Sequence, residues 1–526
     1  MDTKALRQKV LDLAIRGKLV PQDPNDEPAS VLLERIRQQK QQMVKEGKLK
    51  AKDIKNDTTI FVGEDNLHYE KFADGAVKCI EDEIPFELPD GWAWARLGAV
   101  AEAIGDGDHQ PPPQTSSGIP FLVISNVSGG TLSFENTRFV DAEYFSLLPE
   151  TRKPRNGDLL FTVTGSYGIP VLVDTDDKFC FQRHIAIVRP CIISNRYLYV
   201  VLGSSYVKSI CDAKATGTAQ KTVGLATLRE LLIPVAPYKE QMQIYAQTQN
   251  ALSIVDSVSS DKEDLLNIIA STKAKILDLA IRGQLVPQDP TDEPASVLLE
   301  RIRAGKEELI RQGKIKRDKK ESVIFRGEDN SYYEKIGTEV RCIDNELPFE
   351  LPDSWMFVRL KHIGEIVGGG TPKTNINEYW DGNIPWLTPA DFSGYEEMYV
   401  SSGARTITEI GLKYSSAQML PANSVLYSSR APIGYIAITA NPVSTNQGFK
   451  SVVPYDFTMS PYLYCCLKAR TGDIVQRATG TTFKEISGSE MAETIIPLPP
   501  IAEQKRIFEK ATQLLNIIST IEKSLS

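Results

Sequence analysis

Histidines, glycine-rich turns and short catalytic motifs are the places where this chain could do chemistry. The sequence contains no GxxxxGK(S/T) phosphate loop, no HExxH zinc motif and no GxSxG nucleophile elbow. It also lacks the (N/D)PP(Y/F) motif with which amino-methyltransferases hold a flipped base. We interpret each histidine as structural or as a polar contact: His68, His109, His184 and His362. The sequence therefore predicts a chain without a catalytic centre.

Glycine clusters and cysteines indicate a scaffold rather than a cofactor site. The clusters IGDGDH at 104–109 and VGGGTP at 367–372 occupy matching positions, so we interpret them as tight turns of a shared scaffold. The seven cysteines form no CxxC pair, which argues against a zinc cluster or a disulfide framework. Cys79 and Cys342 stand in matching contexts, CIEDEIPFELPDGW and CIDNELPFELPDSW. We expect both to be small, half-buried hydrophobic residues.

The composition is that of an ordinary globular protein with room for several domains. The 526 residues are 41% hydrophobic and 24% charged, and no apolar run approaches the ~18 residues that span a bilayer. The first residues, MDTKALRQKVLDLAIRG, carry charges within their apolar pattern, unlike a secretory signal, so we expect a cytoplasmic protein without membrane contact. The net charge of -8 implies that any nucleic acid is bound through local patches, or with a partner that shares the phosphate contacts.

The elements that would position a site come in two copies. Residues 10–37 read VLDLAIRGKLVPQDPNDEPASVLLERIR, and residues 276–303 differ from them only at Val10/Ile276, Lys18/Gln284 and Asn25/Thr291. Weaker similarity follows: FELPDGWAWARL at 86–97 matches FELPDSWMFVRL at 349–360, ATGTAQK at 215–221 matches ATGTTFK at 478–484, and LLIPVAPYKEQ at 231–241 matches TIIPLPPIAEQ at 494–504. Each half is therefore one near-constant module followed by one variable module.

The two chain ends complete the repeat. The segment EQKRIFEKATQLLNIISTIEKSLS at 503–526 matches only the beginning of the central segment 240–283, and LRQKVLDLAIRG at 6–17 matches its end. Together the termini rebuild a second copy of the central segment. The sequence therefore predicts that the termini meet and close a pseudo-two-fold ring.

Coiled-coil spacing marks the segments that would build this ring. Apolar residues between 507 and 525 follow alternating steps of four and three, the seam of a coiled coil. In the central segment a capping-box pattern at 260–263 predicts that a helix restarts after a break at 257–260. A flexible linker of about 45 residues spans ~35–40 Å with a broad distribution, whereas a helix of that length is ~65 Å long. Only a stiff helical arm can fix the separation of two domains.

The variable modules contain short β-branched and aromatic runs broken by Gly, Pro, Asn and Ser, which predicts mixed α/β domains. We predict an α+β fold in which two such domains are joined by long helices that form an antiparallel coiled coil. Alternating apolar residues with GEDN turns predict a short hairpin before each domain. The expected segments are helices at 1–58, a hairpin at 59–85, a domain at 86–238, central helices at 239–322, a hairpin at 323–348, a domain at 349–500 and a helix at 501–526.

As a set, these motifs resemble one family, the specificity subunits of type I restriction-modification systems. The resemblance covers nearly the whole chain and rests on the LDLAIRG helix ends, ELPDGWAWARL and ELPDSWMFVRL, GGGTPKTNINEYWDGNIPWLTPADF at 368–392, and IPLPPIAEQKRI at 496–507. It implies a non-catalytic chain with two target recognition domains. Each domain would read one half of an asymmetric, bipartite site in double-stranded DNA, and the helices would set the spacer.

The resemblance also implies partners. Two copies of a DNA-adenine methyltransferase subunit are expected to dock on the helices, and restriction subunits can join through them. S-adenosylmethionine, ATP and magnesium would belong to those partners, with no cofactor or metal in this chain. Two identical partners need two identical docking surfaces, which would explain the repeated stretch.

Base recognition requires donors and acceptors in loops, and our candidates lie in corresponding loops of the two domains. In the first domain they are Ser125, Asn126, Tyr167, Gln182, Arg183, His184, Gln220 and Lys221. In the second they are Thr388, Ser429, Arg430, Asn446, Gln447, Lys450, Thr482 and Lys484. The candidates for docking partners lie on the helical stripes: Leu11, Ile15, Ile254, Leu265, Ile269, Ile276, Leu514 and Ile518.

Two other functions stay open at the level of the sequence. A self-sufficient DNA-modifying enzyme would need a catalytic motif of the kinds sought above, and purified chain would then methylate DNA without another protein. A protein-interaction scaffold without DNA specificity would show no sequence preference in a competition binding assay.

Overall fold

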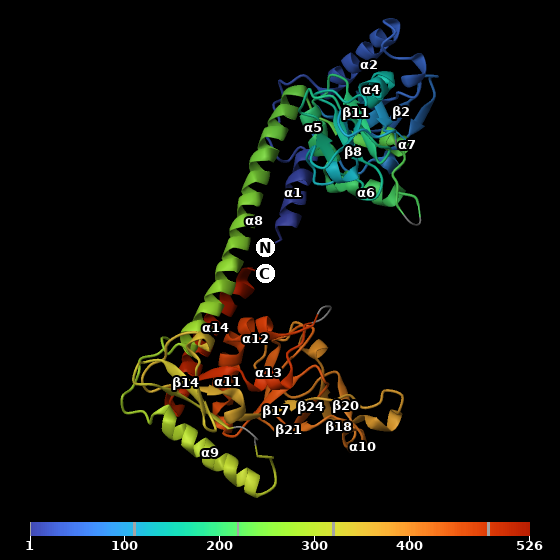
Figure 1. The fold of residues 1–526 in the computed structure, drawn as a ribbon. Coiled ribbons are helices and arrows are strands. Elements are labelled where there is room, and N and C mark those ends of the chain that lie inside the picture. The colour runs from blue at the N-terminus through green and yellow to red at the C-terminus, as the bar shows by residue number, and fades with distance from the viewer. Residues whose placement is uncertain (1, 109–111, 218–219, 318–320, 481–483, 526) are drawn as a thin grey trace. The chain divides into compact units, whose positions relative to one another are not determined.

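The contacts of the computed structural model divide the chain into two units, residues 1–262 and residues 263–526 (Figure 1). The structure describes residues 2–108, 112–217, 220–317, 321–480 and 484–525. Each unit has a large hydrophobic core of its own, and smaller clusters surround it. Helix α8 (Tyr238–Ile281) contributes to both units.

The first unit combines short strands with helices at both of its ends. Its helices are α1 (Thr3–Ile15), α2 (Ala29–Lys45), α3 (Leu97–Val100), α4 (Ala142–Leu147), α5 (Asn195–Leu202), α6 (Ser205–Lys214) and α7 (Leu225–Glu230). Its strands are β1 (Thr59–Val62), β2 (His68–Lys71), β3 (Val77–Cys79), β4 (Ala93–Arg96), β5 (Ala101–Asp106), β6 (Ile119–Leu122), β7 (Arg138–Val140), β8 (Leu159–Thr162), β9 (Pro170–Leu172), β10 (Cys180–Phe181), β11 (Ile185–Pro190) and β12 (Leu232–Val235).

The second unit repeats this order with longer sheets. Its helices are α9 (Ala295–Arg311), α10 (Glu409–Lys413), α11 (Ser460–Ala469), α12 (Thr471–Arg477), α13 (Gly488–Ala492) and α14 (Ile501–Leu525). Its strands are β13 (Ser322–Arg326), β14 (Tyr332–Ile336), β15 (Glu339–Cys342), β16 (Met356–Arg359), β17 (Gly364–Gly368), β18 (Trp380–Leu387), β19 (Tyr399–Val400), β20 (Arg405–Ile407), β21 (Met419–Leu420), β22 (Val425–Tyr427), β23 (Ile436–Thr439), β24 (Val443–Thr445), β25 (Lys450–Pro454) and β26 (Ile495–Leu498).

The central sheets of the two units share one topology. The strand order β5-β11-β8-β9 of the first unit corresponds to β17-β25-β22-β23 of the second, to which β19 adds an outer strand. Strands β8 and β22 are buried along their whole length, so each lies at the centre of its domain. A smaller sheet, β10-β6-β7, corresponds to β24-β18-β20. The predicted mixed α/β domains are therefore confirmed in both units.

A three-stranded antiparallel sheet precedes each variable domain, β1-β2-β3 in the first unit and β13-β14-β15 in the second. We call these the leading sheets. The sequence predicted a two-stranded hairpin here, but a second turn at Gly75 or Gly337, both with positive φ, returns the chain as a third strand. One face of each leading sheet packs on the variable domain through Ile60 and Ile80, or through Ile324 and Ile343.

The long helix α8 is uninterrupted from Tyr238 to Ile281. The predicted break at 257–260 is wrong, because the segment contains neither proline nor glycine and the serines of the capping-box pattern stay helical. Within the first unit, the side chain of Thr3 contacts Ser259 and Arg7 pairs with Asp256, so α1 runs antiparallel to α8. Within the second unit, Lys273 of α8 pairs with Glu522 of α14. The meeting of the chain ends stays a prediction.

The LDLAIRG segments end their helices in the same way. Gly17 adopts a φ of +63°, and the N–H groups of Gly17 and Lys18 donate to the carbonyls of Ala14 and Leu13. This is the Schellman arrangement that stops a helix at a left-handed residue. Gly283 repeats it with a φ of +68°. The repeated glycine thus turns the chain at the same point in both units.

Candidate nucleic-acid interface

Six polar side chains of the first unit, among them Asp106, line a cavity of about 460 Å³ at the end of the central sheet. We call the other five the first polar cluster: Thr164, Arg183, His184, Gln220 and Thr222. The hydroxyl oxygens of Thr164 and Thr222 lie 3.1 Å apart. Burial and the positive charge of Arg183 lower the pKa of His184, so its neutral ring offers one donor and one acceptor. Three members were predicted from the sequence, and the fold brings these three together.

A corresponding set in the second unit contains two cations that share one carboxylate. We call Thr371, Arg430, Gln447, Lys450 and Glu485 the second polar cluster. Nη1 of Arg430 lies 3.7 Å from Oε2 of Glu485, and Nζ of Lys450 lies 3.5 Å from Oε1. Nζ of Lys450 also donates to the carbonyl of Gln447 at 3.4 Å, and the hydroxyl of Thr371 donates to the Gln447 side chain.

The two clusters occupy the same place in the two domains. Thr164 forms a β-bridge with Thr222, and Arg430 forms the equivalent bridge with Glu485. The neighbouring N–H groups of Val223 and Ile486 donate to the residues before Thr164 and Arg430. A neutral hydroxyl pair in one unit therefore stands where the other has an ion pair. Sequence reasoning missed four members of the two clusters: Thr164, Thr222, Thr371 and Glu485. Extending the ATGTAQK and ATGTTFK match by one residue would have reached Thr222 and Glu485.

The glycine clusters position the loops that carry several candidates. A Cβ on Gly107 would lie 2.0 Å from the carbonyl oxygen of Phe181, next to Gln182, and one on Gly369 would lie 2.0 Å from that of Asn446. Both glycines are therefore required for a close approach of two backbones, rather than for the tight turns predicted from the sequence. This approach holds the loops before β11 and β25 against the ends of β5 and β17.

Several predicted base contacts have structural roles instead. The side chain of Asn126 is buried, accepts from the N–H of Val123 and donates to the carbonyl of Glu135, each at 3.0 Å. Ser429 is fully buried and donates to the carbonyl of Gly448, while Thr388 donates to Asp391 at 2.7 Å. Because these polar groups are bonded inside the domain, the three residues are weaker candidates than the other members of the predicted set.

The remaining candidates surround the clusters or lie outside the described residues. Tyr167 donates to Asp212 at 2.8 Å and lies beneath Lys208, and Asn446 accepts from the N–H of Gly448 at 2.8 Å. Thr482 falls outside the described residues. Ser125 and Gln182 lie on short segments of the first domain, and Lys221 and Lys484 are exposed next to Thr222 and Glu485. Contact between any of these and a base stays a prediction.

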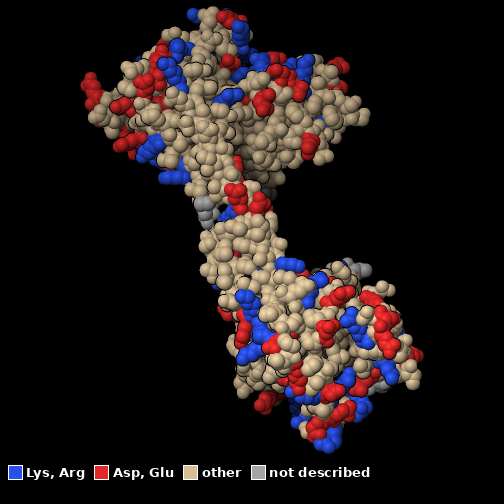
Figure 2. Space-filling view, turned by 90° about the vertical axis from the view of Figure 1, so that its left-hand side faces the viewer, with Lys and Arg blue, Asp and Glu red and all other residues tan. Residues whose placement is uncertain are grey.

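The surface charges are mixed in sign. On the face shown in Figure 2, Lys and Arg are interspersed with Asp and Glu in both units. The chain carries 60 basic and 68 acidic residues, so local groups rather than a general basic field must attract phosphate.

A buried joint connects the constant and variable modules of each unit. Nε1 of Trp92 donates to Glu240 at 2.9 Å, and Nε2 of Gln22 donates to the other oxygen of Glu240 at 3.2 Å and to the carbonyl of Gly17 at 2.6 Å. A Cβ on Gly17 would lie 2.4 Å from Cγ of Pro89, so the helix end packs directly on the PDGW turn. Burial raises the pKa of Glu240 despite the two donated hydrogen bonds.

The second unit repeats the joint almost atom for atom. Trp355 donates to Glu503 at 2.9 Å, and Gln288 donates to Glu503 at 2.6 Å and to the carbonyl of Gly283 at 3.1 Å. Burial again raises the pKa of Glu503. The near-identity of residues 10–37 and 276–303 therefore has one cause inside the molecule, because both copies must form this joint.

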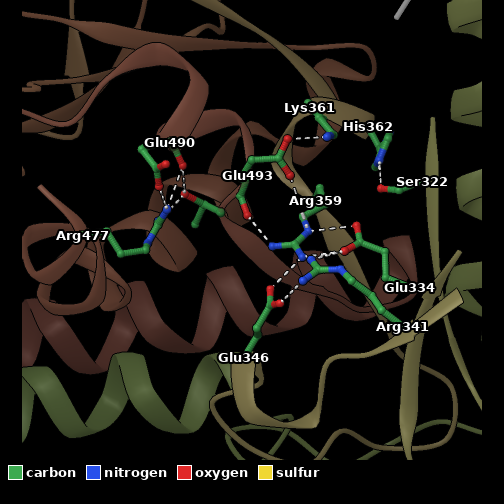
Figure 3. A network of polar contacts seen from close by, with 11 residues as sticks. Ser322, Glu334, Arg341, Glu346, Arg359, Lys361, His362, Arg477, Glu490 and Glu493 are labelled. Atoms are coloured by element: carbon green, nitrogen blue, oxygen red, sulfur yellow. Dashed lines mark hydrogen bonds and ion pairs between the residues drawn. The ribbon is translucent and has the colours of Figure 1, made fainter. Parts of the chain in front are cut away.

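A second repeated network fixes each leading sheet to its domain (Figure 3). In the second unit, Arg359 donates to both carboxylate oxygens of Glu334, at 3.1 and 2.7 Å, and to Glu346 at 2.8 Å, while Arg341 donates to the same two carboxylates. Burial opposes ionisation of Glu334, but the hydrogen bonds from Arg359, Ser322 and Arg341 prevail and lower its pKa to about 2. The first unit has the equivalent contacts of Arg96 with Glu70 and Glu83.

Known proteins are similar to this chain in sequence and in fold. The model of the type I restriction modification DNA specificity domain matches residues 352–526. The type I restriction enzyme EcoAI specificity subunit of Escherichia coli is 27% identical over 99% of this chain and 90% of its own length. The MjaIX specificity subunit of Methanocaldococcus jannaschii is 45% identical, but the match covers 30% of this chain and only 37% of that protein.

Over nearly its whole length the chain is similar to type I restriction specificity subunits. The EcoEI specificity subunit of Escherichia coli, 29% identical over 69% of this chain and 62% of its own length, agrees with this similarity. A solved chain from work on complex assembly and conformational transition of a type I R-M system aligns with a TM-score of 0.54 and 20% identity, over 84% of this chain and 94% of that one. This structure supports the fold alone. The resemblance predicted from the motifs is confirmed.

The stripes proposed for partner docking are largely internal. Leu11 and Ile15 lie in the main core of the first unit, and Ile269 and Ile276 are also buried. These four side chains pack against the chain itself, and docking of a partner on these helices stays a prediction. Leu514 and Ile518 are half-buried, whereas Ile254 and Leu265 are exposed to 65% and 37%.

The described residues contain no group of three or more His, Cys, Asp or Glu arranged to hold a metal ion. No helix within these residues is long and apolar enough to span a membrane. Cys79 and Cys342 are exposed, so the expectation that they are half-buried is wrong. They lie on the face of the leading sheet that points away from the variable domain.

Proposed function

We propose that this chain is the DNA sequence-recognition subunit of a type I restriction-modification complex. Each variable domain reads one half of an asymmetric, bipartite site in double-stranded DNA, and the chain itself is not catalytic. One observation supports this most directly: the joints of the two units are the same, whereas the polar clusters at equivalent places differ in chemistry. Two half-sites of different sequence require this combination.

The two clusters suit different base edges. The first offers hydroxyls, an amide, a neutral imidazole and one arginine, which can donate to or accept from a base edge. The second offers Arg430 and Lys450 as donors and Glu485 as an acceptor, the groups that pair with guanine and with the amino group of cytosine. We propose that these clusters, and not Asn126, Thr388 or Ser429, contact bases.

We propose that two adenine-methyltransferase subunits dock on the constant modules and that restriction subunits join through them. S-adenosylmethionine, ATP and magnesium are then bound by these partners. The mixed charge of this chain fits such an arrangement, because partners can neutralise many of the phosphates. The continuous helix α8 would act as the spacer ruler.

Mapping of N6-methyladenine in a host with and without the gene tests the proposal. We expect one asymmetric bipartite motif that disappears on deletion. Replacing residues 86–238 with another such domain is expected to change one half-site only, and a change in both would contradict the modular function. Insertion of four residues near position 265 is expected to lengthen the spacer while both half-sites persist. An unchanged spacer would contradict the ruler.

A further inference from the structure

The two leading sheets expose the same side chains on the face that points away from the domain. Side chains alternate between the two faces of a strand. Ile60 and its partner Glu70 lie on the inner face, so the residues next to them in the sequence lie on the outer face. We call the exposed sets the outer faces. They consist of Thr59, Phe61, Tyr69, Lys71, Val77 and Cys79 in the first unit, and Val323, Phe325, Tyr333, Lys335, Val340 and Cys342 in the second.

The outer faces are apolar yet accessible. Phe61 and Phe325 are exposed to 41% and 38%, and Val77 and Val340 to 52% and 53%. In β13 buried and exposed residues alternate, with Val323 and Phe325 on the exposed side. A sheet that faces water on one side normally places polar residues there. Both copies therefore keep apolar residues where the isolated chain gains nothing from them.

The aromatic residues of both outer faces are held in place before any partner binds. The rings of Phe61 and Tyr69 stack at 5.8 Å, and those of Phe325 and Tyr333 at 5.9 Å. The hydroxyl of Tyr69 donates to Asp65 at 2.7 Å, and Tyr333 makes the equivalent bond. Such preordering lowers the entropic cost of association, and aromatic anchors dominate protein interfaces.

We propose that each outer face is a docking surface for one copy of the methyltransferase subunit, and that the chain therefore binds this subunit through the leading sheets as well as through its helices. This inference rests on the proposed function. The same face occurs in both units although their polar clusters differ, so its partner is the same in both halves while the DNA half-sites are not. The chemistry predicted for the partner is an apolar patch with a carboxylate placed opposite Lys71 or Lys335.

Other occupants fit the outer faces less well. Exposed acidic groups border them, including Glu64 and Asp65 in the first unit and Glu328 and Asp329 in the second, and these would repel a DNA phosphate. A second copy of this chain is also a poor match. A dimer formed through one patch of each molecule would leave the second patch of both molecules exposed.

The two exposed thiols provide a direct test on the unaltered chain. Cys79 and Cys342 lie in the outer faces, whereas the other five cysteines are buried, and burial raises the pKa of the Cys180 and Cys466 thiols to about 12. N-ethylmaleimide is expected to label Cys79 and Cys342 in the free chain. Labelling rates, measured by mass spectrometry of peptides, are expected to fall at least tenfold for both thiols in the complex with the methyltransferase. DNA alone is expected to leave them unchanged.

Substitutions in the two outer faces extend this test. Phe61→Asp is expected to weaken binding of one methyltransferase copy at least tenfold, and Phe325→Asp the other, so native mass spectrometry would show loss of one copy in each. Leu147→Asp, at a side chain that is 79% exposed on α4, is the matched control and is expected to retain two copies. If a variant fails to fold by circular dichroism, the thiol labelling of the unaltered chain decides.

The outcomes separate this inference from the proposed function. A complex that methylates one bipartite site while both thiols react as fast as in the free chain would overturn the docking surface alone. Protection of only one thiol, or protection by DNA alone, would overturn it too. A chain that binds no methyltransferase and directs no methylation would overturn the proposed function.

Discussion

The buried joints and the polar clusters are the two most informative regions to compare in this protein. The joints bring together a glycine, a glutamine, a tryptophan and a glutamate in each unit, and the Trp92 and Trp355 hydrogen bonds have the same length of 2.9 Å. The clusters share a backbone arrangement but place Thr164 and Thr222 where the other unit has Arg430 and Glu485. The joints, which hold each domain in place, are thus repeated, whereas the polar clusters, which would discriminate between bases, are not.

The buried joints also give a second explanation for the repeated stretch at 10–37 and 276–303. A shared partner was the only cause that the sequence offered for the near-identity of 10–37 and 276–303. The structure adds the joint, which involves Gly17 and Gln22 and their copies. The outer faces, at 59–79 and 323–342, are less similar in sequence but retain exposed apolar residues, and they are the better candidates for a shared partner.

The largest expected effect is loss of an arginine beneath a leading sheet. Arg96→Met is expected to lower the free energy of unfolding by about 3–5 kcal/mol, because it leaves the buried carboxylate of Glu70 without its cation. Arg359→Met should cost less, since Arg341 still pairs with Glu334. Urea unfolding of both variants measures the difference. Equal losses of stability, or a larger loss for Arg359→Met, would show that Arg341 does not compensate for the missing Arg359.

The next largest effect is expected when a methyl group is added to Gly17, the glycine of the first joint. Gly17→Ala is expected to cost about 1–2 kcal/mol for the left-handed backbone and about 1–3 kcal/mol more for the contact with Pro89. Gly47 has a φ of +71° with nothing within 4 Å of a built Cβ, so Gly47→Ala isolates the backbone cost. Thermal denaturation of both variants gives the difference. Equal destabilisation would mean that the helix end does not pack tightly on the PDGW turn.

Removal of the indole donor should affect the two joints equally. Trp92→Phe and Trp355→Phe each leave a buried carboxylate oxygen of Glu240 or Glu503 short of one donor, at an expected cost of about 1–3 kcal/mol. Chemical denaturation of the two variants is the measurement. If the losses in free energy of unfolding of the two variants differ by more than the expected loss itself, the two joints are not equivalent.

Exchange between the polar clusters should alter recognition without altering stability. Glu485→Thr introduces the residue of the first cluster and removes the carboxylate near Arg430 and Lys450. We expect a change at the second half-site worth about 1–3 kcal/mol of base discrimination, with the first half-site unchanged. Methylome mapping of a strain that carries the variant reads both half-sites. Thr222→Glu is the reciprocal control.

The last prediction concerns the pH dependence of stability through Glu334. Its pKa is about 2 in the folded chain against an ordinary 4.5, so ionised Glu334 stabilises the fold above about pH 4.5 and this contribution is lost as the pH falls towards 2. Glu334→Gln should therefore flatten the acid side of the melting-temperature profile. A profile that stays as steep between pH 4.5 and 2 would assign the acid sensitivity to other groups.

Much of the fold followed from the repeat and from local patterns. Helix ends at Gly17 and Gly283 could be located because a left-handed glycine stops a helix wherever it stands. The break near 257–260 was wrong because serines form caps only where the chain leaves the helix, and nothing in this segment forces it to leave. The third strand of each leading sheet was missed because its three or four residue pairs give a weak alternation signal.

The candidate site was predicted only in part, for a related reason. Arg183, His184 and Gln220 could be chosen because donors and acceptors in loops are visible in the sequence. Asn126 and Ser429 have the same side-chain chemistry but are buried and bonded to the backbone. Burial depends on contacts between distant segments, which residue type alone does not report.

The sequence by itself determined the family resemblance, the division into constant and variable modules, and the absence of the catalytic motifs that were sought. These follow from residue identity and from repetition along one dimension. Only the tertiary structure decided which polar groups remain available, that Gly17 lies against Pro89, and that Phe61, Tyr69 and Cys79 form one row across three strands. Such facts depend on which distant atoms come within a few ångströms of one another, and packing alone sets those distances.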